Sequence, residues 1–151
     1  MSDTQADRHH PIVVGVDGSD SSVGALQWAC EQAERTGAHL EAVTAWQWPV
    51  SWGTTIPLPS DFDPAGDAQT MLDQIIEPIV RRHPDVVVHA RAVEGHPAEV
   101  LTEASRHAEL LVVGSRGHGE FSGMLLGSVS QHCAAHAASS VVIYRDHTPT
   151  T

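Results

Sequence analysis

The sequence predicts an α/β protein built on an open, mostly parallel five-stranded sheet with helices on both faces. One observation is that apolar runs of strand length alternate along the chain with segments of helical hydrophobic periodicity. Strands that alternate with helices form parallel sheets, because each helix carries the chain back to begin the next strand in the same direction. A second observation is the length, since 151 residues fit one domain with a core of ordinary size.

The strands are predicted from runs of apolar residues. Residues 12–16 and 110–114 are nearly uninterrupted apolar runs, which is typical of strands buried on both faces of a parallel sheet. The third run ends in an alternating pattern instead. The five predicted strands comprise residues 12–16, 39–45, 85–93, 110–114 and 140–144.

Four helices are predicted between these strands. The first comprises about residues 21–36 and ends before Gly37. Several residues of the run at 17–22, DGSDSS, can cap its start. The second comprises about residues 65–82, and Pro78 should kink it or mark a break, because proline lacks an N–H and clashes with the preceding turn. The third begins at Pro97, since proline is favoured at the first helical position. The fourth precedes the last strand.

A long loop, residues 46–65, separates the second strand from the second helix. It begins with three tryptophans, Trp46, Trp48 and Trp52. A loop of about 20 residues is long for a compact domain and is often functional. We expect the tryptophans to cap one edge of the core, and a flap over a ligand or a subunit contact is the alternative.

The charge balance bears on the possible partners. The chain carries 8 Lys+Arg against 19 Asp+Glu, a net charge of −11. This disfavours a DNA- or RNA-binding surface, because phosphate affinity comes largely from basic residues. The negative net charge is compatible with one bound nucleotide, because backbone N–H groups can hold its phosphates. No apolar run approaches the ~20 residues that span a bilayer, so we expect no membrane insertion.

The ends and the cysteines point to a cytoplasmic protein. Residues 1–10 lack the apolar core of a signal peptide and are expected to be a disordered tail, and residues 146–151 a polar tail. A single domain is expected between them, over residues 11–145. Cys30 and Cys133 lie inside helical patterns, which favours two buried free thiols in a reducing compartment.

Residues 110–130 predict an anion-binding site. A buried strand ends at Gly114, Gly117 follows, and Gly127-Ser128 stands at the start of the last helical pattern. Glycines let backbone N–H groups approach phosphates, and a helix N-terminus adds partial positive charge. A glycine-rich loop that merely turns the chain would look similar. However, Asp17 follows another strand, and ligands bind these sheets beyond the carboxyl ends of the strands, so both features point to one crevice.

Two motifs in the chain are those of a known family. Residues 12–19 read IVVGVDGS, and the second motif is Gly114-x2-Gly117-x9-Gly127-Ser128. With them the chain resembles the universal stress proteins over about residues 11–145. The second motif matches the ATP-binding pattern of that family, and branches that lack it do not bind ATP. The resemblance implies a Rossmann-like universal stress protein domain with ATP as its cofactor, with or without Mg²⁺ or Mn²⁺.

The resemblance also implies roles for individual residues. Those implied to line the nucleoside are Gly15, Val16, Asp17, Val43, Val113 and Gly114. Those implied to hold the phosphates are Gly117, Gly127, Ser128, Val129 and Ser130. Val43 would contact adenine through its backbone, and Asp17 would lie beside the ribose or a metal-bridged phosphate. Arg116 and His118 either add charge near the triphosphate or are solvated loop side chains.

The family further implies the strand order 3-2-1-4-5 and a partner for the last strand. In universal stress proteins the fifth strand commonly pairs with its copy in a second subunit. Residues Val141–Tyr144 would otherwise form an exposed apolar edge, which proteins usually cover or blunt. We therefore expect a homodimer through this strand.

Whether the protein is an enzyme is left open by the sequence, at most as a slow ATPase. Fast phosphoryl transfer needs a positioned water, charge neutralisation and an orienting group, and this chain contains no lysine at all. The favoured interpretation is an ATP-binding stress regulator with slow or no hydrolysis. One alternative is an interaction module with a vestigial pocket. Another is an enzyme of the adenine-nucleotide α-hydrolase architecture, although residues 16–21 lack the tandem glycines of its first loop.

A metal site is the last alternative. His132 and His136 have the i, i+4 spacing that can place two zinc ligands on one helix face. No carboxylate or third ligand accompanies them nearby in the sequence, so no metal-binding residues are predicted.

Overall fold

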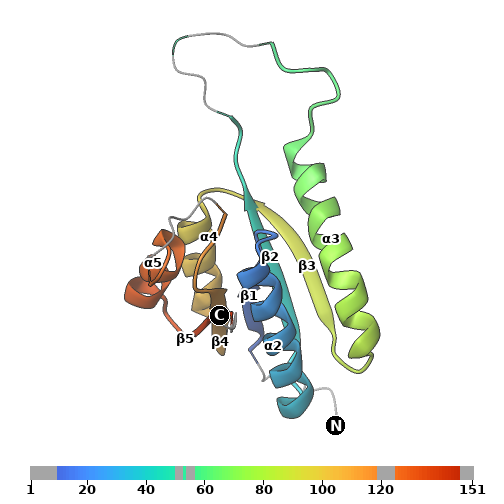
Figure 1. Ribbon diagram of the computed structural model, residues 1–151, viewed down its shortest axis with the longest axis vertical. Helices are drawn as coiled ribbons and strands as arrows, with labels where there is room; N and C mark the ends of the chain where they lie inside the picture. Colours follow the sequence, from blue (N-terminus) through green and yellow to red (C-terminus); the bar gives the residue numbers. More distant parts are fainter. Residues whose placement is uncertain (1–9, 50–52, 54–56, 119–124, 147–151) are drawn as a thin grey trace, which may run out of the picture.

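The sheet is the centre of the molecule. The computed structural model describes residues 10–49, 53, 57–118 and 125–146. The strands in it are β1 (Ile12–Gly15), β2 (Leu40–Trp46), β3 (Val88–Glu94), β4 (Leu110–Gly114) and β5 (Ser140–Tyr144). They lie in the order β3-β2-β1-β4-β5, and every neighbouring pair is parallel (Figure 1). The predicted fold class and the order 3-2-1-4-5 are confirmed.

Helices cover both faces of this sheet (Figure 1). They are α2 (Asp20–Thr36), α3 (Pro64–Arg82), α4 (Pro97–Ala104) and α5 (Ser128–His136), and a 3₁₀ turn, η1 (Ser105–His107), follows α4. Apolar residues of α2 and α3 share one core with the sheet, and those of α4 and α5 share another. The two layers follow from the right-handed crossovers that join parallel strands.

The sheet separates the two cores, and β1 serves both. Val14 belongs to the core beneath α2 and α3, whereas Val13 belongs to the core beneath α4 and α5. Both are fully buried, which explains why this strand is apolar at every position up to Gly15. Cys30 lies in the first core and Cys133 in the second, and both are free thiols, as predicted.

Two local predictions can be compared with the structure. Of the kink or break predicted at Pro78, the break does not occur, since α3 continues through Pro78 as one helix. Pro78 is exposed, whereas Ile76 and Ile79 beside it are buried, so packing holds the helix together. Gln74, whose carbonyl would have accepted from the N–H that proline lacks, is also an exposed residue. The third strand begins at Val88 rather than Asp85, because residues 83–86 form a turn closed by a bond from the Val86 N–H to the His83 carbonyl.

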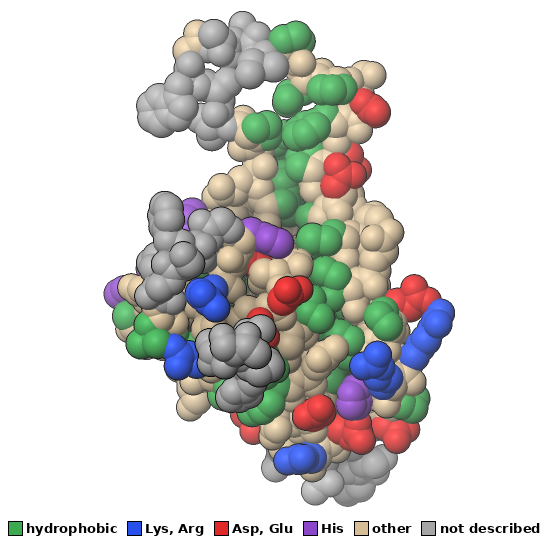
Figure 2. All heavy atoms as spheres, viewed as in Figure 1, with side chains coloured by type: hydrophobic (Ala, Val, Ile, Leu, Met, Phe, Trp, Pro, Cys, Tyr) green, Lys and Arg blue, Asp and Glu red, His purple; other side chains and the backbone are tan. Residues whose placement is uncertain are grey.

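The described parts of residues 47–63 project beyond the sheet at the end where β2 stops (Figure 1). The Trp46 and Trp48 rings meet edge to face at 5.6 Å, and Trp48 lies 6.1 Å from Phe62. Trp48 and Leu58 are both about half exposed, and Figure 2 shows hydrophobic side chains gathered at this projecting end. Trp46 and Trp48 therefore pack on each other and on Phe62, outside both core clusters. Trp52 lies outside the described residues.

None of the described helices combines the length and the apolar character that crossing a bilayer requires.

Candidate nucleotide-binding site

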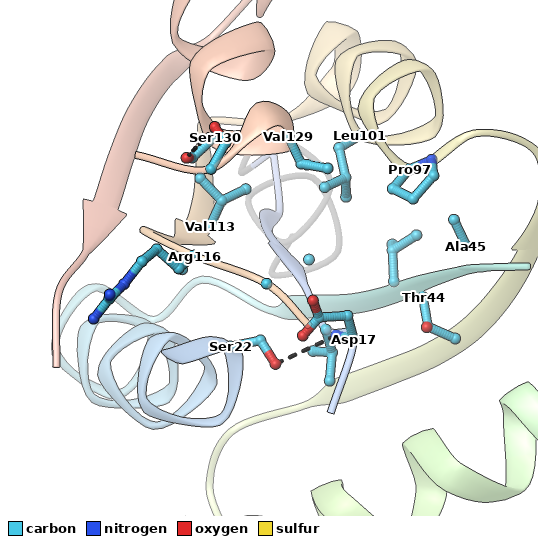
Figure 3. A pocket seen from close by; sticks show the side chains of 16 residues that line it. Asp17, Ser22, Thr44, Ala45, Pro97, Leu101, Val113, Arg116, Val129 and Ser130 are labelled. Carbon is cyan, nitrogen blue, oxygen red and sulfur yellow. Dashed lines mark hydrogen bonds between the residues drawn. The ribbon is translucent and has the colours of Figure 1, made fainter. Parts of the chain in front are cut away.

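A pocket opens where β1, β2 and β4 reach their carboxyl ends. It holds about 620 Å³ of empty space, including the part open to solvent, and Figure 3 shows it from close by. The residues that line it are Gly15, Val16, Asp17, Ser22, Val43, Thr44, Ala45, Pro97, Leu101, Val113, Gly114, Arg116, Gly117, Gly127, Val129 and Ser130. Parallel strands bring their carboxyl ends to one edge, which is why motifs far apart in the chain meet here.

The turn between β1 and α2 fixes Asp17. Its Oδ1 accepts bonds from the Ser19 N–H at 2.9 Å and from the Ser19 hydroxyl at 2.5 Å. Ser19 is also the N-cap of α2, since its hydroxyl accepts from the Ser22 N–H at 3.3 Å. Gly18 has a φ of +86°, a backbone conformation that glycine adopts without strain. The motif DGS thus sets the direction of the Asp17 carboxylate.

These bonds also set the charge state of Asp17. Partial desolvation would raise the pKa of its carboxyl, but hydrogen bonds from Ser19 and Ser22 and the nearby His118 ring together outweigh it. The pKa of Asp17 therefore lies below its ordinary value. Asp17 is a carboxylate at neutral pH, and its side chain points into the pocket (Figure 3).

The loop after β4 approaches Asp17 closely at Gly117. A Cβ atom at Gly117 would lie 2.7 Å from Asp17 Oδ2, so any side chain there would displace the carboxylate or the loop. This close approach explains the middle glycine of the second motif. Both Gly117 and Asp17 line the pocket, so the loop after β4 and the β1–α2 turn meet there.

The N-terminus of α5 forms another wall. Its N-cap is Gly127, which has no side chain to bond the first N–H groups of the helix. The hydroxyl of Ser130 is directed instead at the carbonyls of Ser115 and Gly127, each at 3.0 Å, and Ser130 is buried. The Ser130 side chain therefore shapes the loop. The Gly127 N–H is bonded to the Ser115 carbonyl. Gly127, Val129 and Ser130 line the pocket, so the positive end of the helix dipole lies at its wall.

The structure brings nearly all of the sequence-predicted residues together. All of them line the pocket except Ser128 and His118, whose side chains are exposed. His118 lies instead over Gly18, where its Nε2 would be 3.4 Å from an added Cβ. Arg116 contributes to the wall, but its guanidinium extends away from Asp17 and the pocket (Figure 3).

Sequence reasoning missed five lining residues, which are Ser22, Thr44, Ala45, Pro97 and Leu101. Ser22 carried a signal, because it follows Asp17 within the capping run, and Thr44 and Ala45 simply continue β2 past Val43. Leu101 carried no local signal. It reaches the pocket because α4 lies on β1 so closely that a Cβ at Gly15 would meet Leu101 Cδ1 at 2.6 Å.

The histidine pair on α5 lies apart from this pocket. The His132 and His136 rings are 4.5 Å apart, centre to centre. Within the described residues, no group of three or more histidine, cysteine, aspartate or glutamate side chains is arranged to hold a metal ion.

Comparisons with known proteins give the family. The universal stress protein family model matches residues 9–145. A universal stress protein from Mycolicibacterium smegmatis is 37% identical over 140 residues, which cover 92% of this chain and 47% of that protein. The chain thus spans about half the length of the curated relatives it matches.

Solved structures agree with the fold. The universal stress protein UspA from Lactobacillus plantarum superposes with a TM-score of 0.73 at 20% identity, covering 91% of this chain and 99% of that one. A universal stress protein in complex with cAMP superposes with a TM-score of 0.67 at 29% identity, covering 91% and 97%. On the extent of the family match and the identity to the mycobacterial relative, this chain belongs to the universal stress protein family.

Proposed function

We propose that this chain binds an adenine nucleotide, ATP, in the pocket at the carboxyl ends of β1 and β4 and acts as a nucleotide-dependent stress regulator. One observation carries the proposal. The three glycines of the spaced motif, Gly114, Gly117 and Gly127, all line that pocket, together with the first turn of α5. Backbone N–H groups at glycines and at a helix N-terminus bind phosphates without needing basic side chains. This suits a chain with a net charge of −11.

The rest of the pocket suits a nucleoside. Val43, Ala45 and Leu101 supply an apolar wall beside the ends of β1 and β2. A flat base would fit between such groups, and backbone atoms of Val43 would contact its edge, although the Val43 carbonyl also accepts from the Val16 N–H. The universal stress protein that is 29% identical to this chain was solved with cAMP, which supports an adenine nucleotide as the ligand class.

A metal ion would accompany the triphosphate. Mg²⁺ is usually held by one or two carboxylates together with substrate phosphates and waters. Asp17 fits that role, because it is ionised and its Oδ2 faces Gly117 across the site. Asp17 would hold Mg²⁺ or Mn²⁺, and the ion would neutralise phosphate charge.

Hydrolysis of the bound ATP is slow or absent in this proposal. Among the described residues that line the pocket, Asp17 and Arg116 alone carry a formal charge. The Arg116 side chain points away (Figure 3), and the chain has no lysine to replace it. Little is therefore positioned to stabilise charge that develops in the transition state. The nucleotide would act by stabilising the state that binds it.

The protein also forms a homodimer through β5 in this proposal, in the cytoplasm. β5 lies at the edge of the sheet, and its central residues Val141, Val142 and Ile143 are only half buried. Pairing with a second copy would satisfy the free backbone groups of this edge. The two free thiols support a reducing compartment.

The test is equilibrium binding of ATP, ADP, AMP and cyclic AMP by calorimetry, with and without Mg²⁺, followed by a turnover assay on the same protein. We expect saturable ATP binding and little phosphate release. No binding of any nucleotide would favour an interaction module with a vestigial pocket. Rapid ATP consumption would favour an enzyme, and either result contradicts the proposal.

A further inference from the structure

One buried serine outside the pocket connects its two walls. Ser21 is the second residue of α2 and is buried, and it does not line the pocket. Its Oγ accepts a bond from the Ser115 N–H at 3.0 Å and donates to the Tyr144 carbonyl at 3.4 Å. A single hydroxyl of the β1–α2 unit is therefore bonded to the first residue after β4 and to the last residue of β5.

Ser115 is the point at which the phosphate loop is held. Its N–H bonds the Tyr144 carbonyl at 2.8 Å in addition to Ser21. Its carbonyl accepts from the Gly127 N–H at 2.7 Å and from the Ser130 hydroxyl at 3.0 Å. The backbone of this one residue thus joins α2 and β5 on one side to the start of α5 on the other.

The packing around Ser21 leaves little room for adjustment. A Cβ at Gly114 would lie 2.6 Å from Ser21 Oγ and 2.9 Å from the Ser21 carbonyl carbon. The first turn of α2 therefore touches the end of β4 directly. Across the pocket, Gly117 approaches Asp17 with similar closeness. A small shift at Ser115 would change the distance between the Asp17 wall and the wall formed by Gly117 and α5.

We infer that Ser21 is a positioning residue for the phosphate half of the site. It touches no ligand and acts through Ser115, by fixing the loop and the N-terminus of α5 relative to the β1–α2 turn. The inference rests on the proposed ATP binding. It predicts different effects on the two halves of the pocket, because the nucleoside half, at β2 and α4, has no bond to Ser21 in the described residues.

The experiment compares ATP, AMP and adenosine binding to Ser21→Ala by calorimetry. We expect ATP affinity to fall about tenfold, because the variant loses the hydrogen bond from the buried Ser115 N–H to Ser21 Oγ. Adenosine affinity should change little, so the ratio of ATP to adenosine affinity falls.

Ser105→Ala is the matched control. Ser105 is also buried, and its hydroxyl likewise donates to a carbonyl, that of Thr102 at 2.6 Å, and accepts from an N–H, that of Ala138 at 2.9 Å. It does not line the pocket. We expect this variant to lose stability while its ATP-to-adenosine ratio stays that of the wild type.

The outcomes separate the two claims. If the wild type binds no ATP, the proposed function fails and the inference fails with it. If the wild type binds ATP and Ser21→Ala keeps the wild-type affinity ratio, only the inference is overturned. An equal change of the ratio in Ser105→Ala would overturn it as well, because the effect would then be one of general stability.

Discussion

Gly117 shows how a single missing side chain can define a site. Its Cα lies so near Asp17 that an added Cβ would be 2.7 Å from the carboxylate. In Gly117→Ala we expect ATP affinity to fall about tenfold or more, because an overpacked contact costs about 1–3 kcal/mol. Calorimetric titration with ATP measures the effect. Unchanged affinity would place the phosphates elsewhere.

Gly37→Ala is the control for that prediction. Gly37 ends α2 away from the pocket with a φ of +76°, and an added Cβ there meets nothing within 4 Å. The left-handed conformation should make alanine cost about 1–2 kcal/mol of unfolding free energy. Its ATP affinity should equal that of the wild type. The two glycine variants thus separate a binding effect from a stability effect.

Asp17 predicts a pH dependence with a definite sign. Because the pKa of its carboxyl is lower in the folded protein than in the unfolded chain, the ionised group stabilises the fold. That stabilisation is complete above the ordinary aspartate pKa of about 3.9 and is lost as the pH falls through the lowered value. Urea unfolding at pH 7 and pH 3 should show a smaller acid-induced loss in Asp17→Asn than in the wild type. Equal losses would contradict the assignment.

At the scale of elements, α2 and β5 meet at Gly24 and Tyr144. Glycine inside a helix usually costs about 0.5–1 kcal/mol relative to alanine. Here an added Cβ would lie 2.3 Å from Tyr144 Cε1. We therefore expect Gly24→Ala to destabilise the protein, although the same change in an open helix position would stabilise it.

A double-mutant cycle tests this contact. In the Tyr144→Ala background the ring is gone, and Gly24→Ala should become neutral or stabilising in urea unfolding experiments. If Gly24→Ala has the same effect in both backgrounds, the ring does not limit how closely β5 approaches α2.

At the scale of the whole molecule, the edge strand β5 sets the expected assembly. If β5 pairs with its copy, sedimentation should give about twice the chain mass of 16.2 kDa. Amide hydrogen exchange should then show slow exchange along β5 that becomes faster on dilution. A single-chain mass at all concentrations would contradict the proposed dimer.

The sequence predicted the architecture well because the central strands are buried on both faces. Strands such as β4 are apolar throughout. The glycines that follow β4 were informative too, because at Gly117 the fold leaves no space for a side chain. Leu101 was missed because its place in the pocket depends on how α4 packs against Gly15, which is a tertiary contact. The helix does not break at Pro78 for a related reason, since the buried neighbours Ile76 and Ile79 outweigh a local helix-breaking signal. Ser21 looked like one more capping residue, and only the folded chain brings it beside Ser115.

The sheet divides the interior into two helix layers, and each layer contains one buried cysteine. Burial raises the pKa of the Cys30 thiol to about 11, with Glu31 and Glu34 adding to it, and burial also raises the pKa of Cys133. Each thiol can therefore be alkylated only when its own layer opens. The alkylation rate of each thiol can be measured separately by mass spectrometry at neutral pH. The rate at Cys30 would report how often the α2–α3 layer opens, and the rate at Cys133 how often the α4–α5 layer opens. Because α5 and α4 border the pocket, a bound nucleotide should slow the modification of Cys133 more than that of Cys30.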